Sequence, residues 1–246
     1  MNSFVGISIS FLTLCCSCQT THDNVNDQRL IDENGSLVEN LKMPTDFNED
    51  VVFFDGKIDT TVVVDRKLTP YKGNIRYKGS WADSTGRNLL IISGTLDYQD
   101  GKGRNEIFAY KYVKENGKWL QVCRINDFVD GIGCDLSIKL PKEYIEIRDL
   151  DSNGVAETSF IYTLDNRCDA VMVETKMIIF INQKKYVIRG FSDTWLMPNE
   201  DLYNSYRAAD GLPPVLYKDI DQRLNEFPDI KKYYSSIWDQ YNQEER

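Results

Sequence analysis

The sequence predicts a mainly β fold, an antiparallel sheet built from hairpins, with one C-terminal amphipathic helix as a minor α+β part. From about residue 51, short runs alternate between apolar and polar residues, which is the period of a strand with one buried face. Asn116-Gly117 stands between two such runs, and this dipeptide favours the tight turn of a β-hairpin. Near the C-terminus, apolar residues recur at helical spacing instead.

The first residues predict an export signal. An apolar run of ~13 residues at positions 4–16 is shorter than the ~20 residues of a membrane-spanning helix and fits the apolar part of a secretory signal. The run ends in Ser17-Cys18, which resembles the box of bacterial lipoproteins, where a cysteine after a small residue is acylated. We therefore expect a lipid on Cys18, with Cys16 as the alternative, and an anchor in the outer membrane.

Three segments follow from this interpretation. Residues 1–17 are predicted to be a lipoprotein signal peptide, residues 18–45 a flexible tether, and residues 46–246 a single β-rich domain. The tether sequence is polar and has almost nothing to bury. The chain's one histidine, His22, lies in it, which removes the commonest general base and metal ligand from a folded site.

Within the domain, the alternating runs predict eleven short strands. Residues 83–88, Asp-Ser-Thr-Gly-Arg-Asn, are rich in turn formers and are expected to separate two of them. The predicted strands cover residues 51–54, 60–65, 74–81, 89–93, 106–113, 118–124, 136–140, 144–148, 157–163, 172–181 and 185–189.

The end of the domain predicts a helix over residues 228–243. Pro228 suits its first turn, and we expect its aromatic face to pack on the sheet. A second, short helix is predicted near residues 199–209, ended by Gly211. The residues at helical spacing are Phe227, Ile230, Tyr233, Tyr234, Ile237, Trp238 and Tyr241.

Composition is typical of a globular domain and argues against a nucleic-acid partner. The chain has 29 Lys and Arg against 38 Asp and Glu, a formal charge of −9, whereas neutralising phosphates needs a basic face. Hydrophobic residues make up 41% and aromatic residues 12%, enough for a packed core.

One segment carries a pattern with chemistry in it. Asp149-Leu-Asp-Ser-Asn-Gly-Val-Ala-Glu157 places several oxygen atoms around one point, as hard cations such as Ca²⁺ require. Position twelve of an EF-hand would be Phe160 rather than Glu. The segment resembles instead a single copy of the calcium loops of integrin-type FG-GAP proteins. The alternative is a simple turn with solvated acids. The predicted ligands are Asp149, Asp151, Asn153, the Val155 carbonyl and Glu157.

Three cysteines remain after the signal and lipid positions. An exported chain meets an oxidising compartment, so we expect a disulfide between Cys134 and Cys168, which flank the calcium-type hairpin, and a buried, free Cys123. Closing that loop would stabilise the fold by roughly 3–4 kcal/mol. A nucleophilic cysteine is the alternative, although no histidine of the folded part would lower its pKa.

Common catalytic signatures are missing from the sequence. It has no G-x-S-x-G, no P-loop and no H-E-x-x-H. A glycosidase needs only two carboxylates at a suitable separation, so that activity stays open. Trp81, Trp119 and Trp195 could stack on sugars, but aromatic residues within strands belong to the core in most proteins.

Several stretches together resemble a family of Bacteroidota envelope proteins that is labelled surface polysaccharide biosynthesis. The resemblance covers roughly residues 73–190 and the C-terminal helix; the chain departs from it at Ala170-Val171, where the family has a Ser-Pro pair. It implies involvement with a surface glycan and names no reaction. The matching stretches are 79–88, 106–110, 125–128, 134–135, 149–157, 167–169 and 184–190.

The sequence therefore predicts a lipid-anchored envelope protein that acts as a non-enzymatic binding or assembly factor for surface polysaccharide, with Ca²⁺ as its ion. The first alternative is a glycan hydrolase that uses a carboxylate pair. The second is a module that contacts other envelope proteins through an exposed apolar patch.

Overall fold

The computed structural model describes residues 54–132, 135–167, 173–192, 205, 208 and 218–244. All of them belong to the compact unit Glu49–Arg246. The signal segment, the tether with Cys18, and the predicted pair Cys134 and Cys168 lie outside the described residues.

The first sheet is an antiparallel meander of four strands in the order β1-β2-β3-β4. The Asn116-Gly117 turn between β3 and β4 has φ of 47° and 79°, the left-handed values that such a two-residue hairpin turn requires. This part of the prediction is confirmed. The strands are β1 (Asn74–Asp83), β2 (Gly86–Gln99), β3 (Lys102–Glu115) and β4 (Lys118–Ile132).

The second sheet has six antiparallel strands in the order β10-β9-β8-β7-β5, with β6 paired to β7 beside β5. A short 3-10 helix, η1 (Lys142–Tyr144), separates β5 from β6. The strands are β5 (Asp135–Lys139), β6 (Glu146–Arg148), β7 (Glu157–Arg167), β8 (Val173–Ile181), β9 (Lys184–Ser192) and β10 (Lys218–Ile220).

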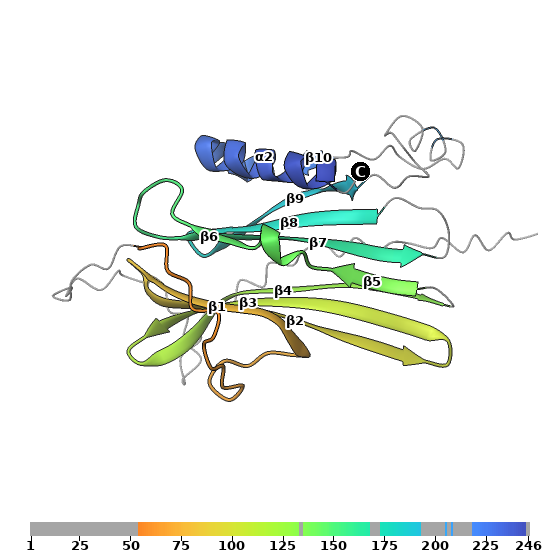
Figure 1. The fold of residues 1–246 in the computed structure, drawn as a ribbon, viewed down its shortest axis with the longest axis horizontal. Helices are drawn as coiled ribbons and strands as arrows, with labels where there is room; N and C mark the ends of the chain where they lie inside the picture. Colours follow the sequence, from red (N-terminus) through yellow and green to blue (C-terminus); the bar gives the residue numbers. More distant parts are fainter. Residues whose placement is uncertain are drawn as a thin grey trace, which may run out of the picture. The chain divides into compact units, whose positions relative to one another are not determined.

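The two sheets pack face to face, and helix α2 (Pro228–Glu244) covers the outer face of the second sheet (Figure 1). Strand alternation divides β7 between these layers. Phe160 and Tyr162 join the core between the sheets, whereas Ile161 joins the cluster beneath α2, with Trp238 and Tyr241 of the helix. The predicted mainly β fold with a C-terminal helix is therefore confirmed.

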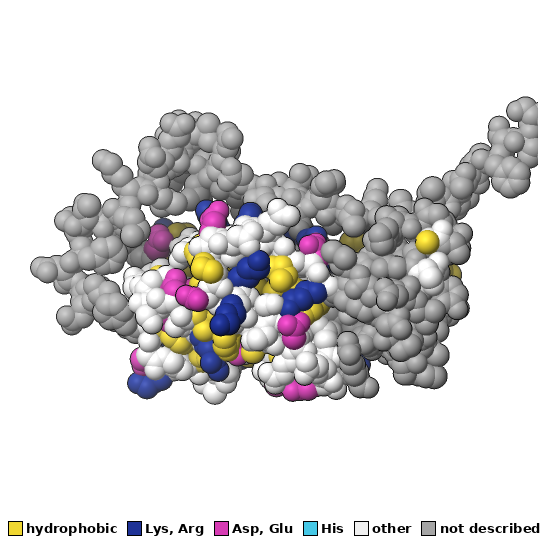
Figure 2. Space-filling view, turned by 90° about the horizontal axis from the view of Figure 1, so that it is seen from above, with side chains coloured by type: hydrophobic (Ala, Val, Ile, Leu, Met, Phe, Trp, Pro, Cys, Tyr) yellow, Lys and Arg dark blue, Asp and Glu magenta, His cyan; other side chains and the backbone are white. Residues whose placement is uncertain are grey.

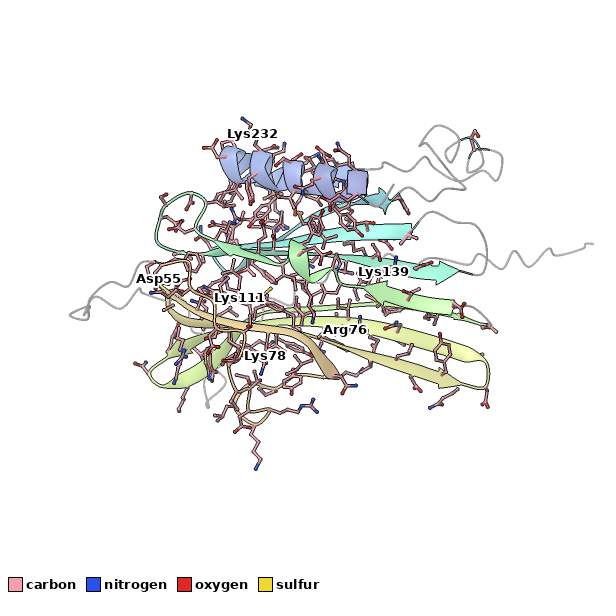
Figure 3. The ribbon with its side chains drawn as sticks, viewed as in Figure 1. Asp55, Arg76, Lys78, Lys111, Lys139 and Lys232 are labelled. Carbon is pink, nitrogen blue, oxygen red and sulfur yellow. The ribbon has the colours of Figure 1, made fainter. Side chains whose placement is uncertain are left out.

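Helix α2 turns its aromatic face to the sheet and its polar face to solvent. Tyr234 is fully buried, Trp238 is 2% exposed, and Lys232 points outward (Figure 3). Figure 2, which looks onto this side, shows basic and acidic side chains spread among apolar ones. Within the described part of the chain, no helix is both long and apolar enough to cross a membrane.

The strand predicted for residues 60–65 is wrong. None of residues 60–65 is paired with a described strand, and the nearest pairing is the isolated bridge between Asp59 and Ser80. Side-chain oxygens of Asp59 and Asp65 accept the backbone N–H groups of the residues two positions later, and such local bonds compete with a strand ladder. Alternation persists, because Val62 and Val64 pack on the outer face of the first sheet while Val63 is 91% exposed.

Other predicted boundaries shift by a few residues. The turn predicted for 83–88 narrows to Ser84-Thr85. Tyr144, placed in a strand by the prediction, belongs to η1. Residue 54 lies outside the strands, and residues 51–53 are outside the described part. Of the short helix predicted at 199–209, only Ser205 and Ala208, both helical, are described.

Candidate cation site in the loop before strand β7

The predicted cation loop joins β6 to β7. Arg148 and Glu157 face each other across these strands, so residues 149–156 form the connection. Ser152 and Gly154 adopt left-handed backbone conformations, with φ of 59° and 84°. Glycine accepts this conformation without the steric penalty of a Cβ, which accounts for glycine at position 154.

Three carboxylates of the motif meet in space. Asp149, Asp151 and Glu157 each offer a ligand oxygen, and these oxygens all lie within 4.8 Å of one another. Calcium binds oxygen at about 2.3–2.6 Å, so two oxygens on one ion lie no more than about 5 Å apart. The three carboxylates therefore fit around a single ion of this size.

Hydrogen bonds within the loop aim the two aspartates. Asn153 N–H donates to Asp149 Oδ1 at 3.1 Å and to Asp151 Oδ1 at 3.2 Å, and Gly154 N–H donates to Asp149 Oδ2 at 2.9 Å. Each carboxylate oxygen keeps further acceptor capacity for an ion. The positions of the two aspartates are thus set by the backbone of the loop itself.

The other two predicted ligands have a different place in the loop. Asn153 Oδ1 accepts the Val155 N–H at 2.7 Å, and Asn153 Nδ2 donates to Asp151 Oδ2 at 2.9 Å. Val155 therefore takes part in the loop's hydrogen bonds through its N–H rather than its carbonyl. The structure brings together the three carboxylates of the predicted set and uses Asn153 to shape the turn.

Glu157 differs from the aspartates because it is completely buried. Its Oε2 accepts the Leu150 N–H at 2.8 Å, whereas its Oε1 has no hydrogen-bond partner. Burial raises the pKa of Glu157 to about 7; the Leu150 N–H opposes this rise, and the charges of Asp151 and Asp149 add to it. A buried carboxylate oxygen without a partner is unfavourable, and a cation held between the three acids would relieve it.

A residue that the sequence did not single out, Asp83, fixes the loop to the first sheet. Its Oδ2 accepts the Trp81 Nε1–H at 3.0 Å and the Ala156 N–H at 3.2 Å. Beside it, Ser84 N–H donates to the Gly154 carbonyl at 2.9 Å. Asp83 lies 73 residues before Ala156, so local spacing gave no signal for this contact.

A lysine between the sheets was also not singled out by the sequence, whereas a buried, free Cys123 was predicted. Lys111 lies between the sheets (Figure 3) and is 2% exposed; burial lowers its pKa, and the charges of Asp83, Cys123 and Glu157 oppose that change. Cys123 is a free, partly buried thiol, whose pKa is raised by burial against the effect of Lys185. A raised pKa is the opposite of what a nucleophilic cysteine needs.

The carboxylate cluster does not suit glycan hydrolysis. The general acid of a glycosidase must reach the glycosidic oxygen, but Glu157, whose pKa is raised as an acid would need, is 0% exposed. The hydrolase alternative gains no support from this cluster and stays a prediction.

Comparisons with protein-family models, with curated proteins and with solved structures gave no match. Function must therefore be inferred from the cation site and its surroundings.

Proposed function

We propose that the domain binds one calcium ion in the Asp149–Glu157 loop and that the ion stabilises the fold without taking part in a reaction. One observation carries this proposal: three carboxylates offer oxygens within 4.8 Å of one another, and one of them is buried with an oxygen that has no partner. Burying that charge without a counter-ion would be costly.

The donor set favours calcium over other common metals. The three acids supply only oxygen ligands, which hard cations prefer, whereas zinc sites include cysteine or histidine ligands. Calcium takes about 6–8 oxygens in flexible geometry, which bidentate carboxylates, the Asn153 and Val155 oxygens and water would supply. Extracellular calcium modules bind the ion with Kd of about 10⁻⁴–10⁻³ M. A partly exposed site of this kind is sufficient for an affinity in that range.

Thermal unfolding tests the proposal. Calcium at about 100 times its Kd stabilises a protein by about 2.7 kcal/mol, which raises the Tm of a domain of this size by about 5–10 °C. The shift should disappear in Asp149→Asn with Asp151→Asn and persist in Asp97→Asn, which alters an exposed aspartate on β2. An unchanged Tm of the unaltered protein at calcium concentrations up to about 100 mM, 100 times the weakest expected Kd, would refute the site.

We further propose, from the resemblance of residues 73–190, that the protein is an outer-membrane lipoprotein and a non-enzymatic binding or assembly factor for surface polysaccharide. Lipid on Cys18 would hold the domain at the membrane, and the ion would keep the domain folded there. A deletion strain complemented with the wild type, Cys18→Ala, or Asp149→Ala with Asp151→Ala tests this. The proposal requires surface glycan to be lost on deletion and restored only by the wild type; an unchanged glycan profile would contradict it.

A further inference from the structure

One residue of the cation loop, Leu150, reaches the apolar cluster beneath helix α2. Leu150 stands between the predicted ligands Asp149 and Asp151, and its side chain packs against the apolar cluster that contains Tyr234 and Trp238 of the helix. The Leu150 N–H also donates to Glu157 Oε2 at 2.8 Å. The backbone that carries two ligands is therefore in contact with both the helix layer and the third ligand.

Glu157 lies on the helix side of the second sheet. It starts strand β7, and side chains two residues apart on a strand share a face. Ile161, four residues on, packs in the cluster beneath α2, so Glu157 shares that face. The charge of Glu157 also acts on the Tyr234 hydroxyl of α2. Burial raises the pKa of Tyr234, a hydrogen bond with Ser159 opposes this rise, and the charges of Glu157 and Glu146 add to it.

Glu146 brings a second carboxylate to the same layer. It pairs with Ser159 across β6 and β7, and its Oε1 accepts the Tyr233 hydroxyl of α2 at 3.0 Å. Arg148 Nε lies 3.7 Å from the same oxygen, but Glu146 Oε2 is buried and has no hydrogen-bond partner. Glu157 Oε1, on the helix side of the neighbouring strand, shares this condition.

Docking of α2 thus covers two carboxylates, Glu157, which is completely buried, and Glu146, whose side chain is 15% exposed, and each has one oxygen without a partner. Like charges in a poorly solvated layer repel each other, and unpaired buried oxygens oppose burial. A cation beside Glu157 would offset one of the two charges and so remove much of that repulsion. The docked helix is then favoured more strongly when the ion is bound.

We propose that the cation loop and helix α2 are thermodynamically coupled, so that calcium in the loop tightens the docking of α2, and docked α2 raises the affinity of the loop for calcium. The inference rests on the proposed calcium site. It names the helix as the element that responds to the ion, and reciprocity between the two effects follows from linkage. An ion that bound the docked and undocked forms with equal affinity would leave the docking equilibrium of α2 unchanged.

Hydrogen exchange of the α2 amides, with and without calcium chloride, tests the coupling, alongside a calorimetric calcium titration of the same protein. If undocking of α2 abolishes binding, calcium at ten times its Kd raises the protection of residues 230–241 by up to about tenfold. A titration that shows binding with unchanged α2 exchange would overturn the coupling and leave the calcium site intact. A titration without binding would overturn both.

A matched pair of variants tests the route through the buried carboxylates. Glu146→Gln removes the second charge but keeps an acceptor for the Tyr233 hydroxyl. Glu143→Gln removes an exposed charge of η1, just before β6 in the chain. Without calcium, the α2 amides of Glu146→Gln should exchange more slowly than those of the wild type. The slowing that calcium adds should be less than half of that in the wild type, and Glu143→Gln should behave as the wild type. Identical behaviour of the two variants would contradict this route, and the wild-type measurement decides the coupling even if Glu146→Gln does not fold.

Discussion

Asp83 accepts four hydrogen bonds although its side chain is only 1% exposed. Besides the Trp81 and Ala156 N–H groups, it accepts the backbone N–H and the hydroxyl of Thr85, at 2.9 and 2.5 Å. These bonds hold the β1–β2 turn and the end of the cation loop together. Asp83 therefore positions the loop relative to the first sheet without being one of its ion ligands.

Replacing Asp83 should destabilise the fold strongly. Asp83→Ala leaves the buried Trp81 and Ala156 N–H groups without acceptors, and we expect a loss of about 2–4 kcal/mol in the free energy of unfolding. Urea denaturation checks this, with Asp97→Ala on exposed β2 as the control. Equal losses in the two variants would show that Asp83 does not anchor the loop.

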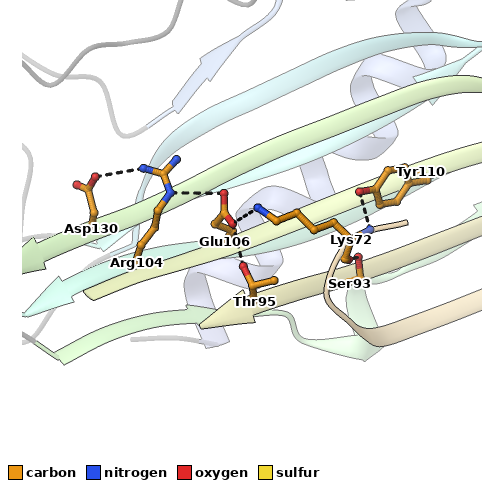
Figure 4. A network of polar contacts seen from close by, with 7 residues as sticks. All are labelled: Lys72, Ser93, Thr95, Arg104, Glu106, Tyr110 and Asp130. Atoms are coloured by element: carbon orange, nitrogen blue, oxygen red, sulfur yellow. Dashed lines mark hydrogen bonds and ion pairs between the residues drawn. The ribbon is translucent and has the colours of Figure 1, made fainter. Parts of the chain in front are cut away.

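Glu106 gives the stability of the fold a pH dependence. Burial acts to raise its pKa, but bonds from Lys72 at 2.7 Å, Thr95 at 2.9 Å and Arg104 at 3.4 Å outweigh burial and lower the pKa below 4.5 (Figure 4). A carboxyl whose pKa is lower in the folded state stabilises the fold above its unfolded pKa. That stabilisation is lost as pH falls through the folded pKa.

The variant Glu106→Gln separates the pH-dependent stabilisation by the Glu106 carboxylate from that of other ionisable groups. It should unfold more easily than wild type at pH 7, and the difference should shrink as pH falls below 4.5, where the wild-type carboxyl becomes protonated as well. Urea denaturation at several pH values measures the difference. Glu115→Gln, at the exposed end of β3, is the control; a difference that stays constant from pH 7 to acid would disprove the ionic role of Glu106.

At the scale of elements, helix α2 depends on its aromatic face. Trp238 is one of the largest buried side chains and is only 2% exposed. It packs in the cluster with Ile179 and Ile188 of the second sheet. Trp238→Ala should cost about 3–5 kcal/mol of unfolding free energy. Lys232→Ala on the outer face should change it little, and thermal denaturation of both variants provides the comparison. A small effect at Trp238 would mean that α2 docks weakly.

The elements were predictable where local sequence decides them. The Asn116-Gly117 turn and the helix over 228–243 depend on neighbouring residues, and both agree with the structure, in which α2 spans Pro228–Glu244. Strand lengths were harder to predict from the sequence. β2 extends to Gln99, beyond the predicted residue 93, because it pairs with β3 from Arg87 to Gln99. A strand ends where its partner ends, and a single sequence does not reveal the partner.

The segment at 60–65 shows the opposite error. Its alternation of valines fits a strand, and alternate valines do pack on the sheet, yet the segment forms no ladder. Contacts from other elements hold it and the chain that follows it: Lys78 Nζ donates to the Val62 carbonyl at 2.6 Å, and the Tyr112 hydroxyl donates to the Pro70 carbonyl. Alternation reports which side chains are buried and does not report how the backbone is paired.

At the scale of the whole molecule, the candidate site lies where three layers of the described unit meet. The three carboxylates could be predicted because they lie within nine consecutive residues, so their spacing alone brings them close. The contact with Asp83 in the first sheet and the burial of Glu157 beneath α2 arise from packing between distant segments. The sequence could therefore indicate the ligands but not the surroundings that set their burial and charge.

Calorimetric titration of the protein with calcium chloride tests the central claim most directly. We expect one ion per chain, with Kd of about 10⁻⁴–10⁻³ M or tighter, and loss of binding in Asp149→Asn with Asp151→Asn but not in Asp97→Asn. Saturable binding at a stoichiometry of one that depends on these two aspartates would agree with the proposed site. No saturable heat up to about 10 mM calcium, ten times the weakest expected Kd, or equal binding by both sets of variants, would contradict it.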